Sequence, residues 1–205
     1  RDEPFPVIVG HPAINEQNGR VLDRPMNNAF FSPFSQLLAI GEGTGVGSGG
    51  LNNLARDADV LYHEYSHAVV ERIVRLGIRP NDFGRAMGEA YADYFPCSFF
   101  NDPDMGEWSV SNLRGLRNLD NDNRFPDDIF FRRTAEPEEH FTGLIWSGAC
   151  WTLRERIGAR NADQVVFDSL FFLPRDGSAN FQNGLTAMLQ ADQSIFDGEH
   201  QGVIR

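Results

Sequence analysis

Apolar residues in the middle of the chain recur at the three- and four-residue steps that are typical of helices. From about Asn53 to Leu76, the positions that follow this spacing are Leu54, Ala58, Leu61, Tyr65 and Ala68. Gly77 then predicts the end of this helix. A second helix is expected from about Asp82 to Phe100, where the turn-like stretch NDPD follows.

Shorter apolar runs predict strands near the amino end and further helices near the carboxyl end. Residues 1 to about 27 suggest an extended lead-in with one strand, in PVIV. The runs AFF and QLLAI, separated by Ser-Pro, predict a pair of strands that ends at Gly41. Residues 101–138 lack periodicity and predict a long irregular region. A third helix is expected from about Phe141 to Ile157, and two shorter ones within 161–173 and 180–196.

Composition and charge narrow the class of protein. The 205 residues, 41% of them apolar, suffice for one domain, or for a body with a small lobe. A net charge of −11 and a pI near 4.8 argue against a nucleic-acid partner, because phosphate binding needs a basic face. No stretch approaches the ~18 uninterrupted apolar residues of a membrane-spanning helix, so no membrane partner is expected. Cys97 and Cys150 form no CxxC motif, and they either pair or stay buried thiols.

A glycine-rich stretch follows the predicted strand pair. Residues 45–50 satisfy the GxGxxG pattern of dinucleotide-binding loops. Such a loop should be followed, about 20 residues on, by an acid that binds the ribose. That position falls inside the predicted helix around His63, so we interpret the stretch as a flexible loop rather than a nucleotide site.

The first predicted helix contains the sequence HEYSH. His63 and His67 lie four positions apart, so a helix presents both imidazoles on one face to a single ion. Glu64 follows the first histidine and can point toward a water molecule on that ion. The motif HExxH encodes this geometry. The alternative is an amphipathic helix with two incidental histidines.

A catalytic zinc ion needs a third protein ligand and an open position. The second predicted helix supplies a candidate in GEAYAD, where Glu89 lies 22 residues beyond His67. Asp93 lies one turn further along the same face, where it can accept the second N–H of a ligating histidine. An exposed acidic pair is the alternative, but the residues that follow, Tyr94 and Phe95, are aromatic.

These motifs, in this order, resemble the gluzincins, the thermolysin-like and fungalysin-like zinc peptidases. The resemblance covers about residues 27–157 and implies an α+β, zincin-like (thermolysin-type) catalytic domain. That domain has a small mixed sheet on the amino-terminal side and a mainly helical carboxy-terminal part. We expect residues 1–76 to form a reduced amino-terminal part with the edge strand and the HExxH helix. Residues 77–205 would form the mainly helical part with Glu89, Arg114 and His140, and the two would make one catalytic unit.

The resemblance also assigns residues around the substrate. NNAFF resembles the family's edge strand, whose backbone pairs with an extended substrate at Asn28 and Ala29. NLRGLRN resembles the family's Leu-Arg pair, so Arg114 would hold a substrate carbonyl. HFTGLIW resembles the HxxGxxW helix start, so His140 matches the histidine that hydrogen-bonds the transition state. The pocket for the residue after the cut would be lined by Leu54, Val60 and Leu113.

The implied function is a zinc-dependent endopeptidase that prefers a bulky apolar residue after the cut. Zn²⁺ held by His63, His67 and Glu89 would lower the pKa of a bound water, and Glu64 would be the general base. The expected substrate is a peptide or an unfolded protein. Secretion to the extracellular space is expected, and the resemblance allows for an inhibitory pro-region outside this chain. A Ca²⁺ site is only partly suggested, by Asp59, Asp104 and Glu107.

Two departures from the family keep other functions open. Only 27 residues precede the edge strand. The interval between His67 and Glu89 lacks the Tyr that assists the family's histidine, and Phe83 is its only aromatic residue. One alternative is therefore a catalytically weak or inactive zincin-fold binding domain. Another is a zinc hydrolase that acts on a non-peptide amide or ester.

Overall fold

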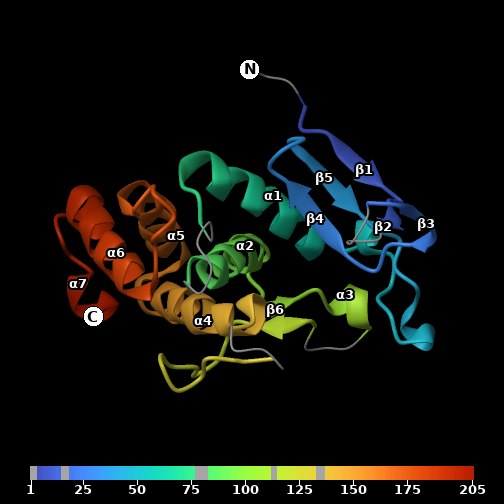
Figure 1. Ribbon diagram of the computed structural model, residues 1–205. Coiled ribbons are helices and arrows are strands. Elements are labelled where there is room, and N and C mark those ends of the chain that lie inside the picture. Colours follow the sequence, from blue (N-terminus) through green and yellow to red (C-terminus); the bar gives the residue numbers. More distant parts are fainter. Residues whose placement is uncertain (1–3, 15–18, 77–82, 112–114, 133–136) are drawn as a thin grey trace.

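The computed structural model describes residues 4–14, 19–76, 83–111, 115–132 and 137–205. A strand-rich part at the amino end lies beside a larger helical part, and α1 (Ala58–Ile73) runs between the sheet and the other helices (Figure 1). None of the helices in these ranges combines the length and the apolarity needed to cross a membrane.

Three short strands form the main sheet, and two more form a hairpin. β1 (Val7–Val9) pairs in parallel with β5 (Leu37–Ile40), which pairs antiparallel with β4 (Ala29–Ser32). The hairpin joins β2 (Pro12–Ile14) to β3 (Val21–Pro25). The predicted strand pair is present as β4 and β5, whereas the lead-in holds three strands in place of one. Most side chains of those three are exposed, so they lack the apolar alternation that marks a half-buried strand.

Helix α1 begins later than the apolar spacing predicts. Residues Leu54–Arg56 form a 3-10 turn, η2, where the spacing places the first helical turn. Asp57 then caps α1, because its side chain accepts a hydrogen bond from the Asp59 backbone N–H. The apolar spacing continues from η2 into α1, so it does not mark where α1 begins. The capping residue Asp57 marks that boundary.

The carboxy-terminal part is mainly helical. Its longer helices are α2 (Gly84–Phe100), α4 (Glu139–Ile157), α5 (Ala159–Ser169) and α6 (Phe181–Phe196), followed by the short α7 (Gln201–Ile204). The segment between α2 and α4 is largely irregular, and its short elements are β6 (Asp104–Met105), α3 (Glu107–Val110) and β7 (Arg117–Asn118). β6 pairs antiparallel with β7. The boundary between residues 76 and 77 stays a prediction, and α1 and α2 on its two sides pack directly against each other.

Helix α2 lies at the centre of the helical part, between α1 and α4 (Figure 1). Its fully buried side chains include Met87, Tyr91 and Tyr94. The close approach of α4 depends on Gly143, where a Cβ atom would lie 2.8 Å from the Ala86 carbonyl oxygen. Cys97 and Cys150 are free, buried thiols, so they do not pair.

Candidate metal centre

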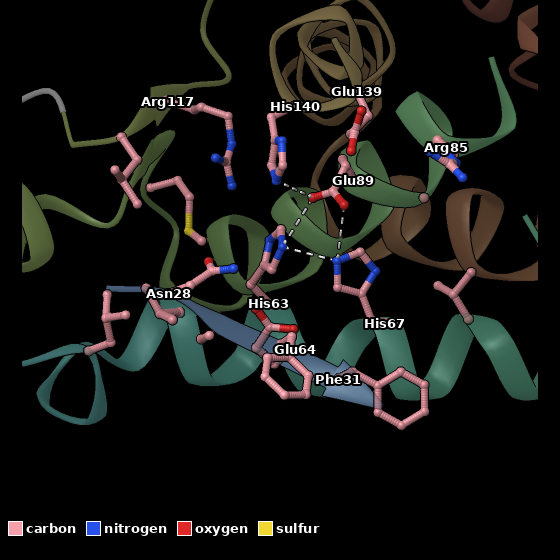
Figure 2. Close-up of a pocket in the computed structure, with 18 of the residues that line it drawn as sticks. Asn28, Phe31, His63, Glu64, His67, Arg85, Glu89, Arg117, Glu139 and His140 are labelled. Carbon is pink, nitrogen blue, oxygen red and sulfur yellow. Dashed lines mark hydrogen bonds and ion pairs between the residues drawn. The ribbon is translucent and has the colours of Figure 1, made fainter. Parts of the chain in front are cut away.

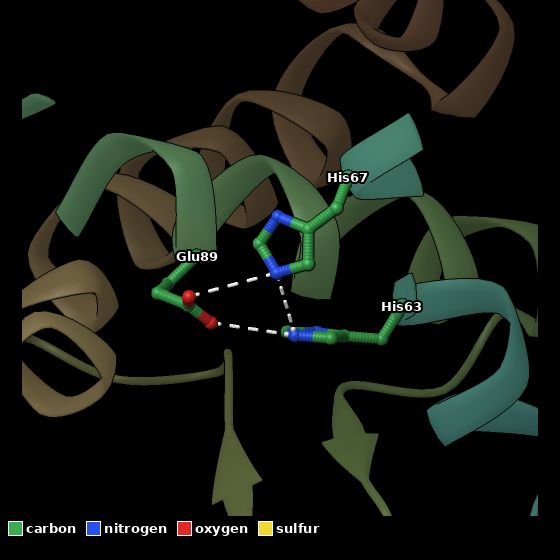
Figure 3. Close-up of side chains that lie close together, drawn as sticks. All are labelled: His63, His67 and Glu89. Carbon is green, nitrogen blue, oxygen red and sulfur yellow. Dashed lines mark hydrogen bonds and ion pairs between the residues drawn. The ribbon is translucent and has the colours of Figure 1, made fainter. Parts of the chain in front are cut away.

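Three potential metal donors converge from two helices. His63 and His67 lie one turn apart on α1, and Glu89 reaches toward them from α2 (Figure 3). The two imidazole Nε2 atoms are 3.1 Å apart. The Glu89 oxygens lie 3.3 Å from His63 Nε2 and 3.5 Å from His67 Nε2. Within the described ranges, this is the one group of three such side chains whose donor atoms all lie within 4.8 Å of one another.

The donor set fits a divalent metal ion. Two imidazoles and one carboxylate are the ligands of several catalytic zinc sites. Glu89 Oε2 is buried without a hydrogen-bond partner, and a buried acceptor in that state costs free energy unless a cation satisfies it. Burial alone would raise the pKa of Glu89, but His67 and His63 outweigh it and hold this pKa well below its usual value. The carboxylate is therefore in the ionised form that binds a metal.

A buried carboxylate orients the first histidine. Asp93 is only 1% exposed, and its Oδ1 accepts a hydrogen bond of 2.8 Å from His63 Nδ1. This bond places a proton on Nδ1 and leaves Nε2, which faces Glu89, as the nitrogen that can bind a metal ion. Arg117 donates to the same carboxylate, from Nε to Oδ2 at 2.6 Å and from Nη2 to Oδ1 at 2.7 Å. Burial would raise the pKa of Asp93, but Arg117 and His63 hold it well below its usual range.

Arg117 is a site residue that sequence reasoning missed. The predicted substrate residues Leu113 and Arg114 lie outside the described residues. The stretch NLRGLRN contains Leu-Arg twice, and the second pair, Leu116 and Arg117, lines the pocket above the metal donors. The repeated dipeptide was the available signal, but spacing alone does not decide which copy reaches the site.

His140 lies at the start of α4, close to the donors. Its Nε2 is 3.4 Å from Glu89 Oε2 (Figure 2). Its Nδ1 is 2.9 Å from Glu138 Oε1. The other oxygen of Glu138 accepts a hydrogen bond from the Phe141 N–H at 2.9 Å and caps the helix. Glu138 was not singled out from the sequence, although an acid directly before a helix is a recognisable cap signal. One carboxylate thus fixes both the helix start and the imidazole of His140.

A pocket of about 460 Å³ opens over these side chains, between β4, α1, α2 and the start of α4 (Figure 2). Glu64 lines it from α1 and is only 6% exposed. Ala29 at the start of β4 and Asn28 just before it also line the pocket. Leu54 and Val60, which were expected to line the pocket for the residue after the cut, line this pocket. The apolar side chains of Met105 and Leu116 line it as well. A carboxylate, an imidazole and a set of metal donors around one cavity are the groups needed to add water to a carbonyl carbon.

Comparisons with known proteins bear on this arrangement. No protein-family model matches the chain. It is 23% identical over 180 residues to extracellular metalloproteinase MEP of Fusarium vanettenii and, equally, to extracellular metalloproteinase 2 of Phaeosphaeria nodorum. Each alignment covers 71% of this chain and 28% of the relative, so the chain spans little more than a quarter of those proteins.

A solved structure shares the fold. The precursor of protealysin, a metalloproteinase from Serratia proteamaculans, matches with a TM-score of 0.71 at 19% identity, over 87% of this chain and 62% of that one. The resemblance to thermolysin-like and fungalysin-like metallopeptidases is confirmed. The α+β, zincin-like fold class expected from that resemblance is confirmed as well, with the small mixed sheet on the amino-terminal side.

The acids expected to bind Ca²⁺ hydrogen-bond to neighbouring groups of the protein. Asp59 Oδ2 accepts a hydrogen bond of 3.0 Å from the Gly106 N–H. Asp104 Oδ1 accepts one from Asn118 Nδ2. Within the described part of the chain, these acids do not join Glu107 in a group with the spacing of metal donors. A Ca²⁺ site therefore stays a prediction.

Proposed function

We propose that this chain is the catalytic unit of a zinc-dependent endopeptidase. The observation that carries the proposal is the convergence of His63, His67 and Glu89 around an unsatisfied carboxylate oxygen, at the base of a pocket bordered by a strand edge. The relatives that are named metalloproteinases support the same class of reaction. A zinc ion in this donor set would supply a Lewis acid and lower the pKa of a water molecule.

Two side chains would move and hold protons. Glu64, on the turn of α1 that carries His63, would take the proton of the attacking water and deliver it to the departing amine. His140 would donate from Nε2 to the carbonyl oxygen as negative charge develops there. Glu138 supports this role because it holds Nδ1 and turns Nε2 toward the pocket.

The substrate would bind as an added strand. Asn28 and Ala29 lie at the pocket side of β4, so an extended peptide could pair with their backbone without its sequence being read. The apolar part of the pocket, with Leu54 and Val60, would receive a bulky apolar residue after the cut. Arg117 lines the same pocket and would hold a substrate carbonyl, while the same role for Arg114 stays a prediction.

The substrate class and location follow the same reasoning. A strand-edge pocket suits a peptide or an unfolded protein, because a folded substrate would have to release a strand first. The relatives named extracellular support secretion. A solved relative that is a precursor supports an inhibitory pro-region outside this chain. The missing Tyr left an inactive binding domain open, but the presence of the proposed base and of all three metal donors argues against it.

The experiment combines metal content with one isosteric variant. Zinc bound to the purified chain is measured by mass spectrometry, and cleavage of unfolded casein is followed with and without phenanthroline. Glu64→Gln should bind zinc like the wild type but cleave about 10²–10⁴-fold more slowly, the usual contribution of a general base. Glu155→Gln, at an exposed position on α4, is the matched control and should cleave normally. If zinc binds and the wild type and Glu64→Gln cleave equally, or neither cleaves, the proposal fails.

A further inference from the structure

Residues 41–53, which we call the glycine segment, are not used by the proposed mechanism. They connect β5 to η2 and extend from the sheet to the side of α3 (Figure 1). Leu51 of this segment and Leu54 just after it line the pocket. Met105 and Leu116 line the same pocket from the β6–β7 hairpin. The glycine segment, through Leu51, and the β6–β7 hairpin, through Met105 and Leu116, therefore each form part of the apolar wall of this pocket.

Asn27 ties the glycine segment to the strand edge. Its Oδ1 accepts hydrogen bonds from the Leu51 N–H at 2.6 Å and from the Thr44 N–H at 3.2 Å. The Thr44 hydroxyl lies 3.4 Å from the same oxygen. Backbone N–H groups only donate, so the atom of Asn27 that meets them must be the oxygen. Asn27 directly precedes Asn28, and it thus links Leu51 to the proposed substrate strand.

Asn52 ties the glycine segment to residues 108–111, which lie between β6 and β7. Its Nδ2 donates to the Trp108 carbonyl at 2.8 Å and to the Ser111 hydroxyl at 2.6 Å. Its backbone N–H donates to the Ser109 carbonyl at 2.8 Å. A carbonyl only accepts, so the side-chain atom that meets Trp108 must be the nitrogen. Trp108 and Ser109 lie in α3 and Ser111 directly follows it, and only Gly106 separates α3 from Met105 at the end of β6.

The glycines allow the segment to close on itself. A Cβ atom at Gly43 would lie 2.1 Å from the Leu51 carbonyl oxygen, and one at Gly50 would lie 1.8 Å from Thr44 Oγ1. At Gly43 a side chain would collide with backbone that cannot move aside, and at Gly50 it would displace the Thr44 hydroxyl. The Gly45 N–H also donates to the Leu51 carbonyl at 2.8 Å. Within the GxGxxG pattern, Gly50 meets this close contact and Gly45 has a φ of +83°, whereas a Cβ atom at Gly47 would have nothing within 4 Å, so chain closure accounts for part of the pattern only.

We propose that the glycine segment is a strap, in which Asn27 and Asn52 fix the width of the apolar pocket and so determine which residue is accepted after the cut. The inference rests on the proposed peptidase function. Asn27 and Asn52 are positioning residues, because they act through Leu51 and through the wall that contains Met105. They meet neither the metal donors nor Glu64.

The two asparagines act with opposite chemistry, which gives a sharp test. Asn27 serves as an acceptor, so Asn27→Asp keeps its hydrogen bonds while Asn27→Leu loses them. Asn52 donates to the Trp108 carbonyl, so Asn52→Asp loses that hydrogen bond and sets a carboxylate against the carbonyl oxygen, while the Ser111 hydroxyl can still donate to the new side chain. The same substitution is therefore tolerated at one position and harmful at the other, which general destabilisation of a loop does not predict. Asn161→Leu, on α5, is the matched control away from the pocket.

The assay uses two fluorogenic peptides that differ only in the residue after the cut, leucine or alanine. The wild type should prefer the leucine peptide in kcat/KM. Asn27→Leu and Asn52→Asp should reduce this preference by about tenfold, the scale on which an apolar pocket discriminates side-chain size. Asn27→Asp and Asn161→Leu should keep it. Equal preference in wild type and Asn27→Leu, or a loss as large in Asn27→Asp as in Asn27→Leu, overturns the proposal.

Hydrogen exchange gives a readout that does not depend on activity. Backbone amides in residues 43–51 and 105–111 should exchange faster in Asn27→Leu and Asn52→Asp, respectively, than in the wild type, Asn27→Asp or Asn161→Leu. Unchanged exchange in Asn27→Leu and Asn52→Asp overturns the strap, even if the peptidase is active. If the wild type cleaves neither peptide, the proposed function fails and the assignment of selectivity fails with it, whereas the exchange data still decide whether the strap exists.

Discussion

The ion pair between Arg117 and Asp93 offers a quantitative test of the site. Arg117→Met would remove two hydrogen bonds of 2.6 and 2.7 Å and the guanidinium charge from a carboxylate that is 1% exposed. Removal of one partner of a buried ion pair costs about 3–5 kcal/mol, because the other charge stays buried without compensation. We therefore expect the free energy of unfolding to fall by about 3–5 kcal/mol. An exposed pair would cost less than about 1 kcal/mol.

The same substitution should weaken metal binding. Asp93 holds the Nδ1 proton of His63, and without Arg117 its carboxylate can turn away or take up a proton. Changes in the partners behind a metal ligand typically reduce metal affinity by about 10–100-fold. Competition with a chromogenic chelator measures this loss. The free energy of unfolding is measured separately, by urea denaturation in excess EDTA, so that metal binding does not contribute.

A double-mutant cycle decides whether the pair itself is responsible. Asp93→Asn alone should also be costly, because it leaves Arg117 charged and buried. In the double variant Arg117→Met/Asp93→Asn both charges are gone, so its loss should be roughly 2–3 kcal/mol smaller than the sum of the single losses. Arg156→Met, at an exposed position of α4, should change stability by no more than about 0.5 kcal/mol. A loss below about 1 kcal/mol for Arg117→Met, or additive losses in the cycle, would refute the reasoning.

Two further predictions concern helix contact and pH. Gly143→Ala should lower the free energy of unfolding by about 1–3 kcal/mol, because the new Cβ would lie 2.8 Å from the Ala86 carbonyl oxygen. It should also weaken zinc binding, because α4 would be pushed away from Glu89. Unchanged urea and chelator titrations would contradict this prediction. Burial raises the pKa of Glu107 to about 7, and the nearby Asp59 carboxylate adds to the effect. A raised carboxyl pKa stabilises the fold below the unfolded value of 4.5, and this contribution is lost as pH rises through about 7. In EGTA, the midpoint temperature of unfolding measured by calorimetry should therefore decrease as the pH is raised from about 5 to about 8. Glu107→Gln should flatten this part of the profile, and identical profiles for the wild type and the variant would contradict the assignment.

Helical spacing explains why the metal donors could be predicted. His63 and His67 face one ion in any straight helix, and the periodic apolar residues around them specify that helix. Glu89 required one more step, since its place opposite the histidines depends on how α2 packs on α1. The sequence could suggest that packing only through the family resemblance.

Residues outside long helices were harder to predict. Arg117 reaches Asp93 because the β6–β7 hairpin turns the chain at that point, and a two-residue strand leaves no periodic signal. Glu138 acts through a helix cap and a contact two residues away, neither of which apolar spacing records. The glycine pattern of residues 45–50 predicted a loop correctly, but its contacts with Asn27 depend on tertiary structure.

Different elements contact the metal donors and the apolar pocket, so zinc affinity and peptide selectivity should respond to different substitutions. Glu89 and Asp93 lie one turn apart on α2, so one helix supplies both a donor and the partner that orients His63. Errors in the packing of α2 would therefore reach the metal centre directly. The glycine segment instead contacts the pocket through Leu51 and meets none of the donors. Arg117→Met should thus lower zinc affinity, whereas Asn52→Asp should alter peptide preference at unchanged zinc affinity. A loss of zinc affinity in Asn52→Asp would show that the apolar wall and the metal centre are coupled.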